Sequence, residues 1–320
     1  MNGAPMSYLA TDGAAADPVT QLGWGLLAIS TAVVVIVALL LAWALWRRRP
    51  ALALDADGRL PVARTGPGLR WVWIGVGIST VALFISTVWT LQTLAAVRAP
   101  PRAPAFTLQI TGHDWWWEVR YVGAAPGQDF TTANEIHLPV GQPVRVELRS
   151  ADVIHSFWAP KLAGKTDVIP GRTNVTWIEA DKPGVYRGQC GEYCGLEHAR
   201  MALQVSAESP ADFRAWLARQ LADPAQPQAP SIAAGAAVFQ ARCGVCHAIR
   251  GTPAEGIYGP DLSHFGGRAM LASGTEPNDA QHLDAWLADP QQVKPGNEMP
   301  RVPLTDGDRA SLVAYLQSLK

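Results

Sequence analysis

Two long uncharged stretches near the N-terminus constrain the fold more than any other feature of the chain. Residues 22–46, LGWGLLAISTAVVVIVALLLAWALW, and residues 71–97, WVWIGVGISTVALFISTVWTLQTLAAV, contain no Asp, Glu, Lys or Arg. Each is longer than the roughly 20 residues that cross the hydrocarbon core of a bilayer. The first is too long for the apolar region of a signal peptide, and no basic residue precedes it. The sequence therefore predicts a transmembrane helix hairpin over residues 22–97.

Charge on either side of these stretches indicates the orientation of the hairpin. Residues 47–70 contain six arginines against two aspartates, whereas residues 1–21 contain neither Lys nor Arg. Basic loops stay on the cytoplasmic side, so residues 47–70 are predicted to be a cytoplasmic loop. Residues 1–21 and everything after about residue 98 then lie on the periplasmic or outer side of a bacterial inner membrane. The formal net charge of −1 gives no indication of a nucleic-acid partner.

The pattern changes to that of a β domain over residues 98–220. The stretches FTLQITGHDWWWEVRY and PVRVELRS alternate apolar and polar residues, as half-buried strands do. Turn signals such as Val-Gly-Gln-Pro, Ile-Pro-Gly and Lys-Pro-Gly separate these runs. Short strands with frequent turns predict a β-sandwich or barrel. The last part, ADFRAWLARQL, is expected to form a short amphipathic helix.

One loop of this domain, CGEYCGLEHARM, gathers metal-ligand side chains. Its spacing is Cys190-x3-Cys194-x3-His198-x2-Met201, and His155 in VIHSFWAP offers a further imidazole. Thiolates and imidazoles suit copper, zinc or iron–sulfur clusters. Zinc favours C-x2-C pairs and four closed ligands, whereas a methionine ligand favours copper. The alternative is a disulfide between the two cysteines, with the histidines and methionine incidental.

A linker over residues 221–231, LADPAQPQAPS, separates the β domain from residues 232–320. There Cys243-x2-Cys246-His247 is a c-type haem attachment motif, in which the histidine next to the thioethers faces the iron. An apolar helical run precedes the motif, and a helix is expected in DGDRASLVAYLQSLK. Met299 in GNEMP is the expected second axial ligand, and a His/Met pair raises the haem potential. The alternative ligands are Met270, interpreted as a packing residue, and His264 and His282, interpreted as polar surface groups.

In this order, these motifs resemble subunit II of caa3-type cytochrome c oxidases, in which a CuA domain is fused to a class I cytochrome c. The resemblance covers residues 20–320 and implies a multidomain membrane protein: a two-helix transmembrane hairpin, a cupredoxin-like β-barrel or sandwich, and an all-α cytochrome c domain. YGPDL at residues 258–262 resembles the Gly-Pro-x-Leu loop of class I cytochromes.

The resemblance also implies roles for single residues. The dinuclear CuA ligands would be His155, Cys190, Glu192, Cys194, His198 and Met201. Glu192 would bind copper through its backbone carbonyl, and its side chain would reach a Mg or Mn ion at the interface with subunit I. Haem c would be held by Cys243, Cys246, His247 and Met299. Trp115 would take up electrons, although Asp114 stands where the family commonly has Gln. Trp116 and Trp117 are interpreted as packing residues.

The function implied is electron entry into a terminal oxidase, an oxidoreductase and translocase whose oxygen-reducing site is on another chain. Electrons from cytochrome c or another donor would pass through haem c and CuA to a haem of subunit I, where oxygen is reduced to water with proton pumping. Subunit III is a further expected partner. Two alternatives are the CuA-containing electron-entry subunit of a nitric oxide reductase and a membrane-tethered carrier without a fixed partner. The glutamate that many members carry near the start of the second helix is absent, and Arg70 lies there instead.

Overall fold

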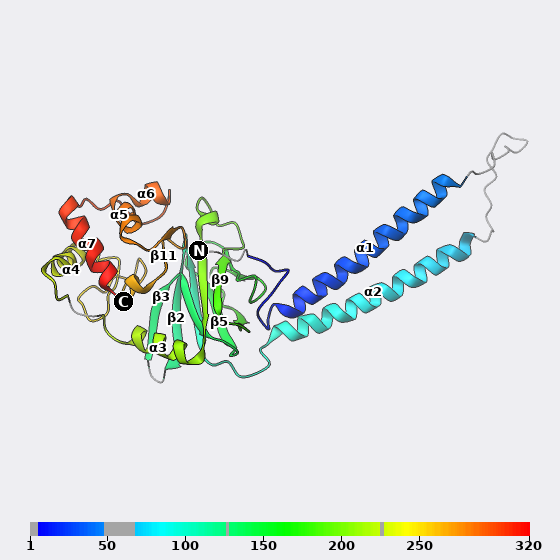
Figure 1. The fold of residues 1–320 in the computed structure, drawn as a ribbon, viewed down its shortest axis with the longest axis horizontal. Coiled ribbons are helices and arrows are strands. Elements are labelled where there is room, and N and C mark those ends of the chain that lie inside the picture. The colour runs from blue at the N-terminus through cyan, green and yellow to red at the C-terminus, as the bar shows by residue number, and fades with distance from the viewer. Residues whose placement is uncertain (1–5, 48–67, 126–127, 225–226) are drawn as a thin grey trace, which may run out of the picture. The chain divides into compact units, whose positions relative to one another are not determined.

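Two long helices near the N-terminus form one compact unit of the chain, residues 18–97. The computed structural model describes residues 6–47, 68–125, 128–224 and 227–320. Helix α1 spans Asp17–Trp46 and α2 spans Gly68–Arg98 (Figure 1). Both predicted helices are confirmed, and each begins a few residues earlier than expected. Asp17 in the first turn of α1 carries a negative charge that the helix dipole favours.

The surface of this helix hairpin is apolar, as the lipid-facing surface of a membrane protein is. The helices have mean hydropathies of 2.8 and 1.8 over their most apolar windows, and none of either window is buried within the protein. Leucine, valine and isoleucine side chains are exposed along both helices. A Cβ added to Gly25 would lie 2.3 Å from the Trp89 ring, so the glycine admits this indole between the helices. The predicted cytoplasmic loop falls mostly on residues 48–67, outside the described residues.

The β domain, residues 107–221, consists mainly of two sheets and ends in a helix. The five-stranded sheet has the order β3-β2-β1-β5-β8, and the three-stranded sheet has the order β4-β10-β9. Strands β6 and β7 form a separate pair. The strand bounds are β1 Thr107–His113, β2 Trp116–Ala125, β3 Gln128–Ala133, β4 Glu135–Pro139, β5 Val144–Ser150, β6 His155–Phe157, β7 Thr166–Val168, β8 Asn174–Ile178, β9 Gly184–Gln189 and β10 Ala202–Glu208. Helix α3, Pro210–Leu221, follows, with the Ser209 side chain accepting a hydrogen bond from the Asp212 amide.

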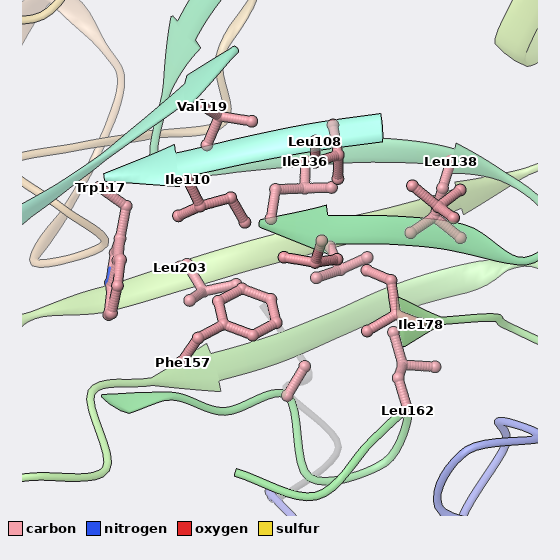
Figure 2. Close-up of a cluster of buried hydrophobic side chains, with 14 of the residues drawn as sticks. Leu108, Ile110, Trp117, Val119, Ile136, Leu138, Phe157, Leu162, Ile178 and Leu203 are labelled. Atoms are coloured by element: carbon pink, nitrogen blue, oxygen red, sulfur yellow. The ribbon is translucent and has the colours of Figure 1, made fainter. Parts of the chain in front are cut away.

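The predicted alternation becomes the core of this domain. In β1, every second residue is buried, and β1 pairs antiparallel with β2 and parallel with β5. Figure 2 shows side chains of both sheets meeting between the layers. The labelled members are Leu108, Ile110, Trp117, Val119, Ile136, Leu138, Phe157, Leu162, Ile178 and Leu203. The packed sheets provide the rigid base from which the loop at residues 190–201 projects.

The C-terminal domain, residues 230–320, is mainly helical. Its helices are α4 Pro230–Arg242, α5 Ala280–Ala288, α6 Pro290–Val293 and α7 Asp306–Ser318, and a short hairpin is formed by β11 Met270–Leu271 and β12 Glu276–Pro277. Helices α4 and α7 pack closely, because a Cβ on Gly235 would lie 2.0 Å from the Ser311 carbonyl oxygen. The side chain of Thr305 caps α7 by accepting from the Asp308 amide. The helices expected before the CxxCH motif and at the end of the sequence are therefore both present.

Candidate copper and haem sites

Side chains of the CGEYCGLEHARM loop converge with His155 in the β domain. Sγ of Cys190 lies 3.7 Å from Sγ of Cys194 and 3.9 Å from Nδ1 of His155. Sγ of Cys194 lies 3.5 Å from Nδ1 of His198 and 3.8 Å from Sδ of Met201. Both cysteines are buried and free. A disulfide needs sulfurs about 2.05 Å apart, so these residues form a ligand cluster rather than the alternative cystine.

The backbone structure of the loop and of strand β6 positions these ligand atoms. The loop joins β9 to β10, and the hydrogen bond from the Cys190 amide to the Met201 carbonyl, 2.9 Å, closes its base. A 3-10 turn, His198–Arg200, directs the imidazole of His198 inward. The Gln189 side chain donates to the His198 carbonyl at 2.9 Å. His155 opens the short strand β6 and is fully buried. Soft ligands held this way by a rigid sheet suit copper.

Glu192, the residue of the expected set that would bind through oxygen, faces the cluster with its backbone. Its carbonyl oxygen lies 3.2 Å from Sγ of Cys190, so the carbonyl faces the cluster as expected. Its carboxylate points elsewhere and pairs with Lys165. The carboxylate is 39% exposed, so a partner chain or a cation could reach it.

The electrostatics of the cluster favour one negative charge shared by the sulfur atoms of Cys190 and Cys194. Hydrogen bonds from Cys194 and His155 lower the pKa of the Cys190 thiol, although burial opposes them. The neighbouring sulfur of Cys190 and burial raise the pKa of Cys194. Metal binding requires deprotonated cysteine, so a bound cation would replace the proton that the pair shares.

A carboxylate behind His155 was not predicted from the sequence. Oδ1 of Asp152 lies 2.7 Å from Nε2 of His155. Burial lowers the pKa of His155, but the hydrogen bonds and negative charges of Asp152 and Cys190 together outweigh burial and raise the pKa to about 9. The bond to Asp152 fixes the ring so that Nδ1 faces the sulfurs, as carboxylates behind metal-ligating histidines do. Asp114, at the position where the family has Gln, lies 3.9 Å from the same nitrogen.

The three consecutive tryptophans have different surroundings. The indole Nε1 of Trp115 donates to the Cys194 carbonyl at 2.8 Å. Trp116 stacks on His113 with ring centroids 4.3 Å apart. Trp117 is buried and packs edge-on against Phe157, as its interpretation as a packing residue requires.

The CxxCH motif lines a mostly apolar cavity of about 340 Å³ in the C-terminal domain. Cys243, Cys246, His247 and Met299 all line it, and so does Met270. Nδ1 of His247 lies 2.8 Å from the Pro260 carbonyl, so it donates and leaves Nε2 free as a metal ligand. The structure thus brings the expected haem-binding residues together, with Met270 beside them.

The cavity also fits the carboxylate edge of a haem. Arg268 lines it, and its Nε is buried without a hydrogen-bond partner among the described residues. A buried guanidinium of this kind matches an anionic group. His264 and His282 do not line the cavity. The interpretation of His264 as a surface group is wrong: it is buried, and its Nε2 contacts the Ala222 carbonyl at 3.1 Å, because the linker folds back over it.

The same cavity reaches the β domain. Its lining includes Trp116 and also Trp115, whose indole donates to the Cys194 carbonyl. Among the side chains that connect the two domains are two buried charged ones, and neither was predicted from the sequence. Lys294 donates to the Trp115 carbonyl at 2.7 Å, and Glu135 accepts from the Ala269 amide at 2.6 Å. In the sequence each is one charged residue among many.

Comparison with known proteins agrees with this geometry. Residues 106–208 match the family model for the cytochrome c oxidase subunit II periplasmic domain, and residues 232–320 match that for cytochrome c. Cytochrome c oxidase subunit 2 of Alkalihalophilus pseudofirmus is 36% identical over 295 residues, covering 90% of this chain and 82% of that protein. The chain belongs to the cytochrome c oxidase subunit 2 family.

A further relative of this subunit 2 chain supports the assignment. Cytochrome c oxidase subunit 2 of Bacillus sp. strain PS3 is 31% identical, over 79% of this chain and 74% of that protein. A crystal structure of the periplasmic domain of cytochrome oxidase subunit II from Bradyrhizobium japonicum is 32% identical. It covers 37% of this chain and 95% of that one, with a TM-score of 0.34. The two family models imply CuA copper and haem, and the fused cytochrome domain fits the caa3 type.

Family membership makes the chain a subunit of a haem–copper terminal oxidase, which is an oxidoreductase. Family membership also implies that the chain associates with the oxidase complex. It further implies that the chain is a membrane protein with a periplasmic domain, in agreement with its two apolar helices.

Proposed function

We propose that this chain is the electron-entry subunit of a terminal cytochrome c oxidase, relaying electrons from haem c to a CuA pair and on to a haem of subunit I. One observation carries the proposal: Trp115 lines the CxxCH cavity and also donates to the carbonyl of Cys194. One aromatic side chain therefore touches both candidate cofactor sites. Reduction of oxygen to water, with proton pumping, takes place on the partner chain.

In this proposal the six residues of the copper cluster hold two copper ions. When bound, the pair accepts and releases one electron at a time. The thiolates of Cys190 and Cys194 supply charge, and His155 and His198 supply one imidazole each. The Met201 sulfur and the Glu192 carbonyl serve as weak ligands. Asp152 holds the His155 ring, and the closed base of the loop keeps the ligand atoms nearly fixed.

The C-terminal domain holds haem c in the cavity. Cys243 and Cys246 form the thioethers, and His247 is held with Nε2 free by the Pro260 carbonyl. Met299 would supply a further ligand to the iron, and hydrogen bonds fix its loop from both sides. The Met299 amide donates to the Asn297 side chain at 2.9 Å, and the Met299 carbonyl accepts from the Gln291 side chain at 3.2 Å. Fusion to the copper domain raises the effective concentration of this haem at the copper site.

The carboxylate of Glu192 is assigned to a Mg or Mn ion shared with subunit I. Carboxylate oxygens suit these hard cations. The carboxylate is accessible, and within the described part of the chain it pairs with Lys165 in an exposed ion pair that costs little to separate. The remaining partners proposed are subunit III and an upstream donor such as cytochrome c, with the haem and copper domains on the outer side of a bacterial inner membrane.

The relay can be tested on the full-length chain in detergent, loaded with copper and haem. A flash-activated photoreductant places one electron on the haem, and absorbance follows haem and copper separately. The proposal predicts that the haem is reoxidised as the copper band disappears, at a rate independent of protein concentration. A rate proportional to protein concentration, or a haem that stays reduced, would contradict an intramolecular relay.

A further inference from the structure

The ammonium group of Lys294 lies at the contact between the β domain and the C-terminal domain. The residue follows α6 and is only 2% exposed. Nζ donates to three backbone carbonyls, those of Trp115 at 2.7 Å, Arg200 at 3.0 Å and Ala272 at 3.3 Å. An ammonium group has three N–H donors, so each has an acceptor. Because this lysine is buried and each of its N–H groups has a carbonyl partner, its side chain forms a specific contact between the two domains and is not a solvated surface charge.

Two of these carbonyls lie directly beside the candidate copper site. Trp115 donates from its indole to the Cys194 carbonyl at 2.8 Å, and Arg200 immediately precedes the candidate ligand Met201. The third carbonyl, like Lys294 itself, belongs to the C-terminal domain. One side chain therefore connects two peptides of the β domain, those of Trp115 and Arg200, to the haem-binding domain.

The loop after Lys294 packs on the indole of Trp115. Gly296 has a φ of +82°, a conformation that glycine adopts readily. A Cβ there would lie 3.0 Å from Leu196 and 3.7 Å from the Trp115 ring. The backbone thus lies against the aromatic ring with no side chain between them.

The same loop leads rigidly to the candidate haem ligand. The Asn297 side chain donates to the Lys294 carbonyl at 2.6 Å and accepts from the Met299 amide at 2.9 Å. Gln291 donates to the carbonyls of Asn297 and Met299 at 2.8 and 3.2 Å. A displacement of Lys294 relative to the copper domain would therefore be passed to Met299.

We propose that Lys294 is a positioning residue that sets the separation and orientation of the haem and copper sites by holding the Trp115 peptide against the haem-binding domain. This inference rests on the proposed relay, because the separation matters only if an electron crosses it. Electron transfer between fixed sites slows steeply with distance, so loosening this contact slows transfer.

The test compares Lys294→Met with wild type in the full-length, cofactor-loaded chain. Lys161→Met is the matched control, because that lysine pairs with Asp12 elsewhere on the β domain. Hydrogen exchange is measured for residues 112–118, 200–204 and 270–274. We expect at least about fivefold faster exchange there in Lys294→Met alone, the lower end of what an unsatisfied buried acceptor costs. Exchange in α4 and α7 should stay unchanged.

The second readout is the photoinduced haem-to-copper rate, with both reduction potentials measured. We expect a rate several-fold below wild type, and lower than the measured change in potentials alone would give, because loss of the buried charge also shifts the copper potential. Lys294→Gln should lose less, and it also serves if the Met variant does not assemble. Rates and exchange equal to those of wild type would overturn the role of Lys294. So would faster exchange across the whole C-terminal domain, which would make the residue a general stabiliser. Absence of transfer in wild type would instead overturn the proposed relay.

Discussion

The sulfur atoms of Cys190 and Cys194 lie 3.7 Å apart with no bond between them, and this separation limits what can replace either one. A hydroxyl group cannot bridge two soft metal ions as a thiolate can. Cys194 also contacts His198 and Met201, whereas Cys190 contacts His155 and the Glu192 carbonyl. Each residue of the cluster thus has a separate chemical role.

We predict that Cys194→Ser abolishes the mixed-valence copper signal, because the second bridging sulfur is lost. Electron paramagnetic resonance of the loaded chain measures this directly. The haem spectrum of the same sample is the internal control and should not change, since the CxxCH cavity contains no atom of Cys194. A retained mixed-valence signal would show that the copper pair is held elsewhere.

The two methionines in the haem cavity can be separated by a pair of variants. Met299→Ala should remove the sulfur-to-iron absorption band of the oxidised haem and lower its potential, because the thioether ligand favours the reduced iron. Met270→Ala is the matched control and should keep the band, although it also lines the cavity. The reverse result would assign the ligand role to Met270.

At the level of secondary-structure elements, the close contact between α4 and α7 depends on one glycine, Gly235. A Cβ on Gly235 would lie 2.0 Å from the Ser311 carbonyl oxygen and 2.8 Å from Tyr315, so alanine forces the helices apart. We expect Gly235→Ala to destabilise the C-terminal domain by about 1–3 kcal/mol, the usual cost of overpacking. Thermal unfolding followed at the haem band measures this. Gly267→Ala is the control, since its added Cβ meets nothing within 4 Å, and an equal loss in both would contradict the packing argument.

Several elements could be predicted because their signals are local. The apolar runs of α1 and α2, the alternation in β1 and the spacing of Cys190 to Met201 each depend on neighbours in the sequence. Helix ends were less predictable, because α1 begins at Asp17, five residues before its apolar run. Asp152 was missed although it stands three residues before His155, because one acidic residue in a turn is common. The burial of His264 depends on the linker folding back, which spacing does not reveal.

At the scale of the whole molecule, the contact between the β domain and the C-terminal domain is the part that the sequence could not predict. Lys294 and Glu135 read as ordinary charged residues, yet they are 2% and 6% exposed. Glu135 accepts from the Ala269 amide at 2.6 Å and the Met270 amide at 3.2 Å. Glu135 and these two amides are far apart in the sequence and come together only in the folded protein.

This contact should depend on pH. Burial raises the pKa of Glu135 above its ordinary value of 4.5, while His137 and Arg268 oppose the rise. The docked form then holds a proton that the separated form has lost, so docking weakens as pH rises from 4.5 through the raised pKa. Proteolysis of the linker at residues 222–229 measures undocking. Glu135→Gln should remove this weakening. Burial also lowers the pKa of Lys294, at the same contact, to about 7, and this acts in the opposite sense at higher pH. An unchanged pH profile in the variant would exclude Glu135 as the source of the weakening.

The decisive measurement is oxygen uptake by the membrane complex that co-purifies with this chain, with a chemical reductant supplying the tail haem. A terminal oxidase should show rapid, cyanide-sensitive uptake that is lost in Cys194→Ser. Absence of uptake together with consumption of nitric oxide would keep the ligand assignments and contradict the terminal-oxidase function.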